Sequence, residues 1–386
     1  MDGLSVIVIG AGIGGLTTGI ALSKAGYQVE IYERVSELRP VGAGISLWSN
    51  GVKVLNALGL GKQMAAIGGQ MDRMQYLDLT GKLLNDIDLH PLIHQVGQRP
   101  YPVARADLQY MLLKAFPGKV HLNSTCIEVK QTEHDATALF EDGQAVTADL
   151  IVGADGVRST VREAVLGQST TPRYAGYVNC NGLIPVSDEL ADKNTWVIYV
   201  GEHKRASMMP VGGDRFYFFF DLPLPETASP HPNGIRTELI ETFKGWCPPV
   251  QNLIQALEPN TTNRLPIRDV GPLETFVKGR IALLGDAAHT TTPDLGQGGC
   301  QALEDAIVLS RYLTTTTISV QDALKRYETE RIARTGKLVL KARYRTDEIH
   351  GKDPAITQKW YEQLGTEPPE AVTGAIAKTI LGGPLG

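Results

Sequence analysis

Cysteine is scarce in this chain. The 386 residues include only four cysteines, Cys126, Cys180, Cys247 and Cys300, with no C-x-x-C spacing among them. A disulfide framework and a zinc ribbon both need a denser cysteine pattern, so neither is expected, and a reducing cytoplasm is the favoured location. The H-E-x-x-H motif is also missing, and the eight histidines predict no metal site.

Positive charge and long apolar runs are scarce as well. The net charge is −5, so no basic surface for nucleic acid is expected. No run approaches the ~20 apolar residues that cross a membrane, and the apolar N-terminus lacks the basic region of a signal peptide. A chain of 386 residues exceeds one hydrophobic core. We therefore expect a soluble, two-lobed enzyme with no nucleic acid, no membrane and no obligate protein partner.

Glycine, in contrast, is plentiful and patterned. A predicted strand at Val6–Ile9 runs into Gly10-Ala11-Gly12-Ile13-Gly14-Gly15 and then into an apolar helix. In this G-x-G-x-x-G context, backbone N–H groups and a helix N-terminus bind a pyrophosphate. A second strand ends at Glu33, whose carboxylate would accept a hydrogen bond from a ribose 2′-hydroxyl. Because an acid there disfavours a 2′-phosphate, the loop predicts FAD or NAD and not NADP.

A second glycine-rich stretch lies far downstream. Gly285-Asp286-Ala287-Ala288-His289 follows a predicted strand at 280–284, and Pro293 and Gly296-Gln297-Gly298-Gly299 come next. Two such stretches at opposite ends of the chain indicate one long cofactor bound across the fold. His289 is tempting as a general base, but we interpret it as a structural member of its motif.

The intervening segments predict an α/β fold with a second, α+β lobe. A βαβ pattern fills residues 1–72, sheet-like alternation covers 74–103, a helix covers 105–116, and short strands lie within 120–153. Residues 174–264 alternate as a mainly antiparallel sheet with one helix near 234–246, and only helices follow residue 286. The Arg- and Lys-rich helix at 320–350 is interpreted as a solvated face.

A predicted hairpin decides which side chains share a face of that sheet. The turn Gly212-Gly213-Asp214 separates its two strands. A slip of one residue would move one set of side chains to the opposite face. If the turn centres the hairpin, one face carries Arg205, Ser207 and Met209 from the first strand and Tyr217, Phe219 and Asp221 from the second.

Three motifs together carry a resemblance to a known family. The glycine loop with Glu33, the Asp155-Gly156 element after a predicted strand, and Gly285–His289 follow the order seen in class A flavoprotein aromatic hydroxylases. The resemblance implies a Rossmann-type FAD-binding domain, an inserted, mainly antiparallel substrate domain, and C-terminal helices. We expect the FAD-binding domain to comprise 1–73, 102–175 and 265–386, and the substrate domain to comprise 74–101 and 176–264.

Longer strings are similar to the bacterial FAD-dependent urate hydroxylases. These strings are Pro40–Ser46, Arg173–Asn179, Lys204-Arg205, Arg215–Phe220, Thr292–Asp294 and Gly382–Gly386. The similarity implies hydroxylation of urate at C5 to 5-hydroxyisourate, with NADH and O₂, through a flavin C4a-hydroperoxide. No separate domain for NADH is visible, so NADH would visit a surface cleft transiently. Cys180, between Asn179 and Asn181, is the departure that could alter the volume of the pocket.

The substrate implied by this similarity calls for a cation in the pocket. Urate is already an anion near neutral pH, so the reaction requires no general base. Arg205 offers a planar fork that pairs with the edge of such an anion. Asn179 supplies a donor and an acceptor, Tyr217 a hydroxyl, and Gly296 a backbone group. The expected catalytic residues are Arg205 and Tyr217, and the expected substrate-binding residues are Asn179, Arg205, Tyr217 and Gly296.

The expected FAD contacts come from both glycine-rich stretches and from residues between them. The resemblance implies that Asp155 serves both FAD and the pyridine nucleotide, and that Pro293 and the following loop lie against the isoalloxazine. Backbone N–H groups at a helix start there would stabilise a reduced, anionic flavin. The expected set is Gly10, Gly12, Gly14, Gly15, Glu33, Arg34, Ser46, Arg105, Cys126, Asp155, Asp286, Pro293, Gly296, Gln297, Gly298, Gly299 and Cys300.

Two other functions stay open at this point. One is a hydroxylase of a salicylate- or hydroxynicotinate-like acid, with the same FAD chemistry and a different pocket. The other is a non-catalytic flavin- and ligand-binding sensor, which would bind FAD without substrate-stimulated NADH consumption. Intact Asp155, Asp286 and Pro293 favour an enzyme over a sensor.

Overall fold

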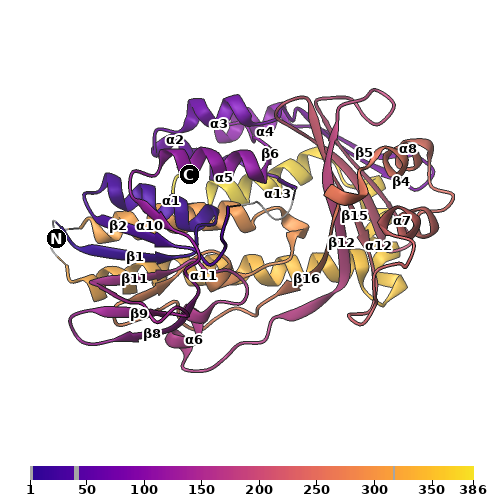
Figure 1. Cartoon of the computed structure of the whole chain (residues 1–386). Coiled ribbons are helices and arrows are strands. Elements are labelled where there is room, and N and C mark those ends of the chain that lie inside the picture. The colour runs from indigo at the N-terminus through magenta and orange to yellow at the C-terminus, as the bar shows by residue number, and fades with distance from the viewer. Residues whose placement is uncertain (1–2, 39–42, 316–317) are drawn as a thin grey trace.

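The computed structural model describes residues 3–38, 43–315 and 318–386. Residues 40–42, part of one string that carries the resemblance, lie outside these ranges. Two large sheets dominate the molecule, and long strands and a long helix run between them (Figure 1). The predicted fold class, α/β with a mainly antiparallel second sheet and C-terminal helices, is confirmed.

The first large sheet is six-stranded and almost entirely parallel. Its central strands are short, apolar and buried, as expected of a sheet covered on both faces. β17 is the one antiparallel partner in it. In spatial order the strands are β17 (Val277–Lys278), β18 (Ile281–Leu283), β11 (Leu150–Gly153), β1 (Ser5–Ile9), β2 (Gln28–Tyr32) and β7 (Lys119–His121).

Helices and two small sheets surround this sheet. Helix α10 packs against α1, α2 and α11, and α5 packs against α1. The helices are α1 (Ile13–Lys24), α2 (Ser49–Ala57), α3 (Gly61–Ile67), α5 (Arg105–Ala115), α6 (Thr160–Leu166), α9 (Asp286–His289), η2 (Pro293–Leu295) and α10 (Gly298–Leu313). The small sheets consist of β8 (Cys126–Gln131), β9 (Ala136–Phe140) and β10 (Ala145–Ala148), and of β3 (Gly44–Ile45) and β6 (Val103–Ala104).

The second large sheet is seven-stranded and antiparallel except where β13 meets β4. One of its faces packs a separate apolar cluster against α7 (Ile235–Thr242) and α8 (Pro248–Ala256). A short 3₁₀ turn, η1 (Pro259–Thr261), follows α8. In spatial order the strands are β16 (Asn263–Asp269), β12 (Arg173–Pro185), β15 (Arg215–Leu222), β14 (Lys204–Val211), β13 (Thr195–Gly201), β4 (Arg73–Asp78) and β5 (Leu83–Asp88).

Two helices in this half of the molecule were not predicted from the sequence. Helix α4 (His90–Val96) lies in the segment expected to be sheet, and α8 follows the one helix that was expected. Both have proline in their first two positions, where it favours a helix start but is easily interpreted as a turn. Gly97, with φ 69°, ends α4 in the left-handed conformation that suits glycine.

The C-terminal helices are α11 (Val320–His350), α12 (Pro354–Thr366) and α13 (Pro369–Leu381). The interpretation of α11 as a solvated face was wrong for several of its arginines. Arg331 is 0% exposed, and Arg343 donates to both carboxylate oxygens of Asp269. Charge counts alone cannot separate such residues from surface ones, because their partners lie far away in the sequence.

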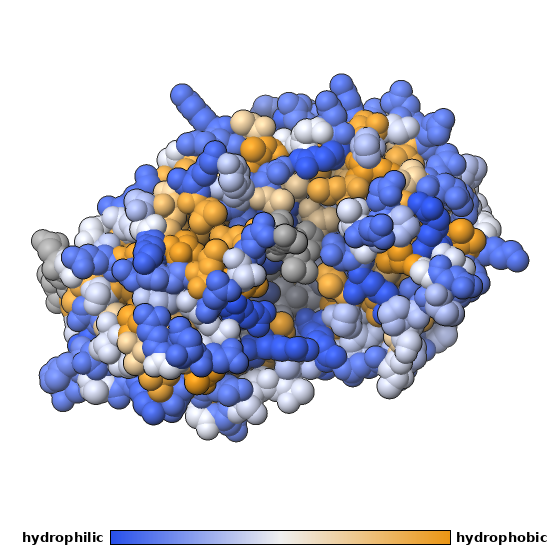
Figure 2. Space-filling model, in the orientation of Figure 1, coloured by the Kyte–Doolittle hydropathy of each residue, from blue (hydrophilic) through white to orange (hydrophobic). Residues whose placement is uncertain are grey.

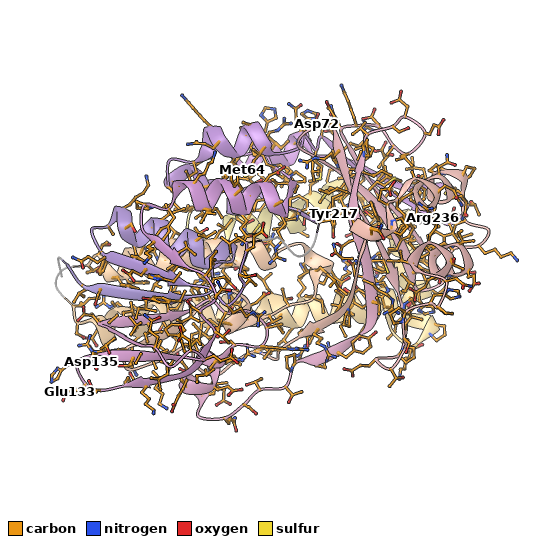
Figure 3. All side chains as sticks on the ribbon, viewed as in Figure 1. Met64, Asp72, Glu133, Asp135, Tyr217 and Arg236 are labelled. Carbon is orange, nitrogen blue, oxygen red and sulfur yellow. The ribbon has the colours of Figure 1, made fainter. Side chains whose placement is uncertain are left out.

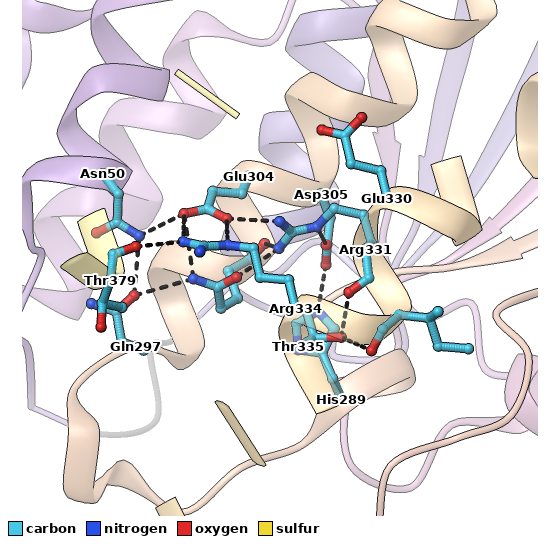
Figure 4. A network of polar contacts seen from close by, with 12 residues as sticks. Asn50, His289, Gln297, Glu304, Asp305, Glu330, Arg331, Arg334, Thr335 and Thr379 are labelled. Atoms are coloured by element: carbon cyan, nitrogen blue, oxygen red, sulfur yellow. Dashed lines mark hydrogen bonds and ion pairs between the residues drawn. The ribbon is translucent and has the colours of Figure 1, made fainter. Parts of the chain in front are cut away.

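Arg331 is the centre of a buried polar network that ties α11 to α10 (Figure 4). Its Nε donates to Asp305 Oδ1 at 2.6 Å and its Nη1 to Glu304 Oε2 at 2.7 Å. The other oxygen of Asp305 meets His289 Nε2 at 2.6 Å and accepts from Gly285 N at 2.8 Å. Burial alone would raise the pKa of Asp305, but His289 and Arg331 outweigh it and lower that pKa to about 2.

The surface of the molecule combines hydrophilic and apolar regions. The periphery is largely hydrophilic on the face that Figure 2 shows, and apolar residues gather toward its middle. Across the described ranges, no helix combines the length and apolar character needed to cross a bilayer.

Replacing Arg331 tests how much the buried network contributes to the free energy of unfolding. Arg331→Met keeps the volume but leaves Glu304 and Asp305 short of a partner, so we expect a loss of about 3–5 kcal/mol in the free energy of unfolding. Urea unfolding of the purified variant measures this loss. The matched control is Lys337→Met, an exposed position of the same helix, which should change little.

The pH dependence of the same network has a definite sign. The folded-state pKa of Asp305 is depressed, so its stabilisation is complete above the ordinary value of 3.8 and is lost as the pH falls toward about 2. Wild type should therefore lose stability over this acid range more steeply than Asp305→Asn. Equal acid slopes in the two proteins would contradict the assignment.

Candidate active site

One large cavity connects the two sheets. Its volume is about 380 Å³, and its walls come from the glycine loop, the start of α5, the stretch that follows β18, and one face of the seven-stranded sheet. Tyr217 lies on the side of that sheet that faces the six-stranded sheet (Figure 3). The predicted residues that line the cavity are Gly12, Gly14, Ser46, Arg105, Asn179, Arg205, Tyr217, Asp286, Pro293, Gly296, Gly298 and Gly299.

The glycine loop has the geometry of a phosphate cradle. Gly10 has φ 106°, and a Cβ there would meet the carbonyl oxygen of Ala154 at 2.4 Å. A Cβ on Gly15 would meet the Gly10 oxygen at 1.9 Å, so helix α1 packs as closely as only glycine allows. Gly12 differs, because a Cβ there would meet nothing within 4 Å. The open space beside Gly12 belongs to the cavity and leaves room for a bulky ligand.

Glu33 lies directly after β2 and already supports the loop. Its Oε2 accepts from the backbone N–H of Ala11 at 2.7 Å, and its Oε1 accepts from Val35 N at 3.2 Å. The carboxylate therefore lies beside the loop, although Glu33 itself does not line the cavity.

The middle of the cavity carries a carboxyl group and a guanidinium group. Asp286 is the first residue of α9 and Arg105 the first residue of α5, and both side chains are accessible from the cavity. The surrounding protein raises the pKa of Asp286 by desolvation, and His289, Arg105 and Arg162 oppose this rise. Asp286 can accept hydrogen bonds from hydroxyls of a bound ligand, and Arg105 can pair with phosphate.

The far end of this region is a helix N-terminus that faces the cavity. After η2, Gly296 turns the chain with φ 61°, where a Cβ would meet Ser46 Oγ at 2.4 Å. Gly298 and Gly299 then begin the 16-residue helix α10. Their backbone N–H groups and the positive end of the helix dipole favour negative charge in front of them.

The end of the cavity at the seven-stranded sheet depends on the register of one hairpin. Arg205 pairs with Asp221, Ser207 with Phe219, and Met209 with Tyr217, so the predicted shared face is confirmed. Arg205, Met209, Tyr217 and Phe219 of this face line the cavity. Burial, together with Asp221, raises the pKa of Tyr217, which keeps its hydroxyl protonated and makes it a donor.

Arg205 is buried between two carboxylates. Its Nε donates to Asp221 Oδ2 at 2.8 Å and its Nη2 to Asp294 Oδ1 at 2.6 Å. Burial alone would lower the pKa of the guanidinium, but Asp221 and Asp294 outweigh it and raise that pKa. Among the residues that the structure describes, Nη1 has no hydrogen-bond partner. It is therefore Nη1, and not the whole fork, that is free to bind a ligand.

The carboxylates that hold Arg205 are themselves held in place. Asn179 Nδ2 donates to Asp221 Oδ1 at 2.7 Å, while the Asn179 oxygen accepts from Asn181 at 2.6 Å. His350 Nδ1 lies 2.7 Å from the His203 carbonyl oxygen, and its Nε2 faces Asp221 Oδ2 at 3.6 Å. Burial alone would raise the pKa of Asp221, but Arg205, His350 and Asn179 lower it.

Several predicted site residues lie outside the cavity lining. Arg34 is exposed, and the buried Cys126 and Cys300 contact backbone carbonyls through their sulfurs. Asp155 accepts from Ser159 Oγ and from the first N–H groups of α6, so its side chain stabilises that helix. Gln297 joins the buried network through Asn50 and Gln301.

The structure contradicts the suggestion that Cys180 could alter the volume of the pocket. Cys180 is 0% exposed and packs in the apolar cluster under α7 and α8, with Phe218 and Phe220. Successive residues of a strand face opposite sides, so Asn179 faces the cavity and Cys180 faces away.

The sequence reasoning missed four residues that line the substrate end. They are Tyr76 and Trp196 from neighbouring strands, Ile198, and Asp294. Asp294 follows Pro293 directly and could have been suspected from that position. The others could not, because the parallel pairing of β4 with β13 joins segments far apart in the chain.

The fold and the cavity define a flavoprotein of the hydroxylase type. A family described as an FAD binding domain matches residues 3–342. The FAD-dependent urate hydroxylase of Mycolicibacterium vanbaalenii is 49% identical over 99% of this chain and 98% of its own length. The enzyme of that name from Klebsiella pneumoniae subsp. pneumoniae is 46% identical over 99% and 100%.

A solved structure agrees with these relatives. The crystal structure of Klebsiella pneumoniae HpxO complexed with FAD and uric acid has a TM-score of 0.95 to this chain, with 45% identity. The match covers 99% of this chain and 98% of that one. The chain belongs to the FAD-binding class A flavoprotein hydroxylases and, within them, to the family of FAD-dependent urate hydroxylases.

The open space beside Gly12 leads to a test of cofactor binding. Gly12 has φ −72°, which alanine adopts freely, and the weaker N-cap of alanine is offset by the smaller chain entropy that it loses on folding, so Gly12→Ala should change the stability of the cofactor-free protein by less than about 1 kcal/mol. Its methyl group enters the cavity, so FAD affinity should fall by about tenfold or more, equivalent to ~1.4 kcal/mol. Fluorescence titration of the cofactor-free protein with FAD measures the affinity.

The matched comparison is Gly15→Ala, which should unfold or strongly destabilise the protein because its methyl group meets the Gly10 oxygen. Unchanged FAD affinity in Gly12→Ala would show that the dinucleotide does not pass over this loop.

Proposed function

We propose that this protein is an FAD-dependent monooxygenase that hydroxylates urate at C5. The balanced reaction is urate, O₂, NADH and H⁺ giving 5-hydroxyisourate, water and NAD⁺. The observation that carries the proposal is the buried cation Arg205, which faces the same cavity as the glycine loop and the N-terminus of α10. The relatives whose names specify urate match over nearly the whole chain, which supports this substrate.

The residues that would hold FAD follow the length of the cavity. Gly12 and Gly14 would meet the pyrophosphate with Arg105, Glu33 would lie toward the ribose, and Asp286 would accept from hydroxyls along the linker. Pro293, Gly296, Gly298 and Gly299 would lie against the flavin ring. We propose that the other expected cofactor residues act through backbone or packing, because their side chains are engaged elsewhere. We also propose the division into an FAD-binding domain (1–73, 102–175, 265–386) and a substrate domain (74–101, 176–264).

When bound, FAD supplies the redox chemistry that links NADH to O₂ and transfers one oxygen atom to the substrate. The protein binds the substrate and FAD and orients them toward each other. Arg205 Nη1 would donate to the planar anion. Asn179 would offer the second hydrogen of its Nδ2 and the second lone pair of its Oδ1, because Asp221 and Asn181 use the first of each. Asp221 and Asp294 fix the guanidinium in advance, which limits the entropy lost on binding.

Tyr217 would act as a hydrogen-bond donor and as a shield from water. Its raised pKa excludes a phenolate role near neutral pH, and the buried His289 is committed to Asp305. Neither is placed to remove a proton, which suits a substrate that is already an anion. The apolar walls at Ile198, Met209 and Phe219 exclude water from the reacting carbon.

We further propose that NADH visits the surface transiently and that the protein works in the cytoplasm. All four cysteines are free thiols and buried, which suits a reducing compartment.

The assay that tests the function follows NADH in air with FAD-loaded protein, with and without urate. We expect urate to accelerate NADH oxidation and to disappear in equal amount, with little hydrogen peroxide. Acceleration with nearly all electrons lost to peroxide would make urate an effector only. No acceleration would refute the proposal, and salicylate or a hydroxynicotinate would then be assayed in the same way.

Arg205 provides a second test. Arg205→Gln removes a charged donor, so kcat/KM for urate should fall about 10- to 100-fold, corresponding to ~1.5–3 kcal/mol. Arg205→Lys, which keeps the charge but not the second nitrogen at Asp294, should recover only part of this loss. Arg268→Gln, at a partly exposed ion pair with Glu226, is the control. An FAD content and a melting temperature equal to those of wild type would show that the fall in kcat/KM does not arise from misfolding.

A further inference from the structure

A second cavity opens beside the first. Its volume is about 160 Å³, and it lies between α11, α13 and strands β4 and β13 of the seven-stranded sheet. Four residues line both cavities: Tyr76, Trp196, Arg205 and Asp294. We call the second cavity the outer chamber. Lys341, Glu367 and Ala375 line it and are exposed, so it reaches the surface between α11 and α13.

The walls of the outer chamber combine flat aromatic rings with positive charge. Trp48, Trp196 and Trp360 contribute indole rings. Arg345 lies 5.9 Å from the ring centroid of Trp360 and pairs with Glu348 at 3.4 Å. Lys341 and the carboxylate of Glu367 both line the chamber, and neither side chain forms an ion pair or a hydrogen bond with any residue in the described ranges. Indole rings beside an ammonium group suit a planar anion.

The wall between the two cavities contains one polar side chain that no hydrogen bond holds among the described residues. Trp196 is fixed, because its Nε1 donates to Ser207 Oγ at 2.8 Å. Tyr76 is half-buried, and its hydroxyl has no hydrogen-bond partner in the part of the chain that the structure describes. The pKa of the Tyr76 hydroxyl is raised, mainly by burial. Arg345 and Arg205 oppose this rise, and Glu367 adds to it. The phenol thus lies within the influence of charges from both cavities.

We propose that the outer chamber is a second binding site for a planar heteroaromatic anion, through which substrate or product passes between solvent and Arg205. The inference rests on the proposed function, because it assigns the same class of ligand to both cavities. Lys341 attracts the anion, the indoles receive its flat faces, and Tyr76 separates the chamber from the reaction site. Arg205, which both cavities share, then receives the anion at Nη1.

Two substitutions address the chamber without touching the inner site. Lys341→Gln removes the unpaired ammonium group, and Ala375→Trp fills the mouth from an exposed position of α13. The matched controls are Lys337→Gln on α11 and Ala371→Trp on α13, both exposed and both outside the lining. Because all four positions are exposed, the variants should keep the melting temperature and FAD content of wild type.

The experiment is calorimetric titration of the FAD-loaded protein with urate, without NADH. Wild type should bind two urates per chain, one tight and one at least about tenfold weaker. Ala375→Trp should lose the weak site and keep the tight one, and Lys341→Gln should weaken it about three- to tenfold. Both controls should match wild type.

Kinetics give an independent measurement. Lys341→Gln should lower kcat/KM for urate about three- to tenfold, leave kcat unchanged, and reduce the dependence of kcat/KM on ionic strength. A single urate site in wild type, or a weak site that survives unchanged in Ala375→Trp and Lys341→Gln, would overturn the proposal that the outer chamber binds urate and would leave the proposed function standing. Absence of the tight site in wild type would instead overturn the proposed function.

Discussion

The buried guanidinium of Arg205, held between Asp221 and Asp294, is the interaction on which the arrangement of the site depends. Asp221 comes from β15 of the seven-stranded sheet. Asp294 comes from η2, directly before helix α10, whose N-terminus faces the cavity. Asp294 also accepts from Tyr177 on β12 and from Thr346 on α11. One charge cluster therefore joins the seven-stranded sheet, η2 and the long C-terminal helix. A buried ion pair is weak evidence for stability, but removing one partner leaves the others unpaired at high cost.

The Arg331 network plays a comparable part beneath the cofactor region. It holds Asp305, which in turn fixes His289 and the backbone of Gly285, so the turn that delivers Asp286 is supported from behind. Both networks use arginines, whose planar group can satisfy two or three acceptors at once. Their shared use of α11 means that the helix supports both the turn that delivers Asp286 and the carboxylate of Asp294 that holds Arg205.

Much of the fold followed from local patterns. The glycine loop with Glu33, the hairpin register around Gly212–Asp214 and the long helix that ends at His350 were all predicted, because each depends on nearby residues. The errors at α4 and α8 arose from prolines that begin a helix but resemble a turn. The error over the arginines of α11 arose because their acidic partners lie on β16 and α10.

The sequence by itself determined which residue types are available and which strand faces they occupy, since side chains alternate along a strand and glycine tolerates conformations that others do not. Only the tertiary structure decided what those residues contact. It turned Cys180 away from the cavity, committed Asp155 to a helix terminus, and left Arg205 with one free nitrogen instead of a free fork. Contacts of this kind arise from packing between distant segments, which no local pattern encodes.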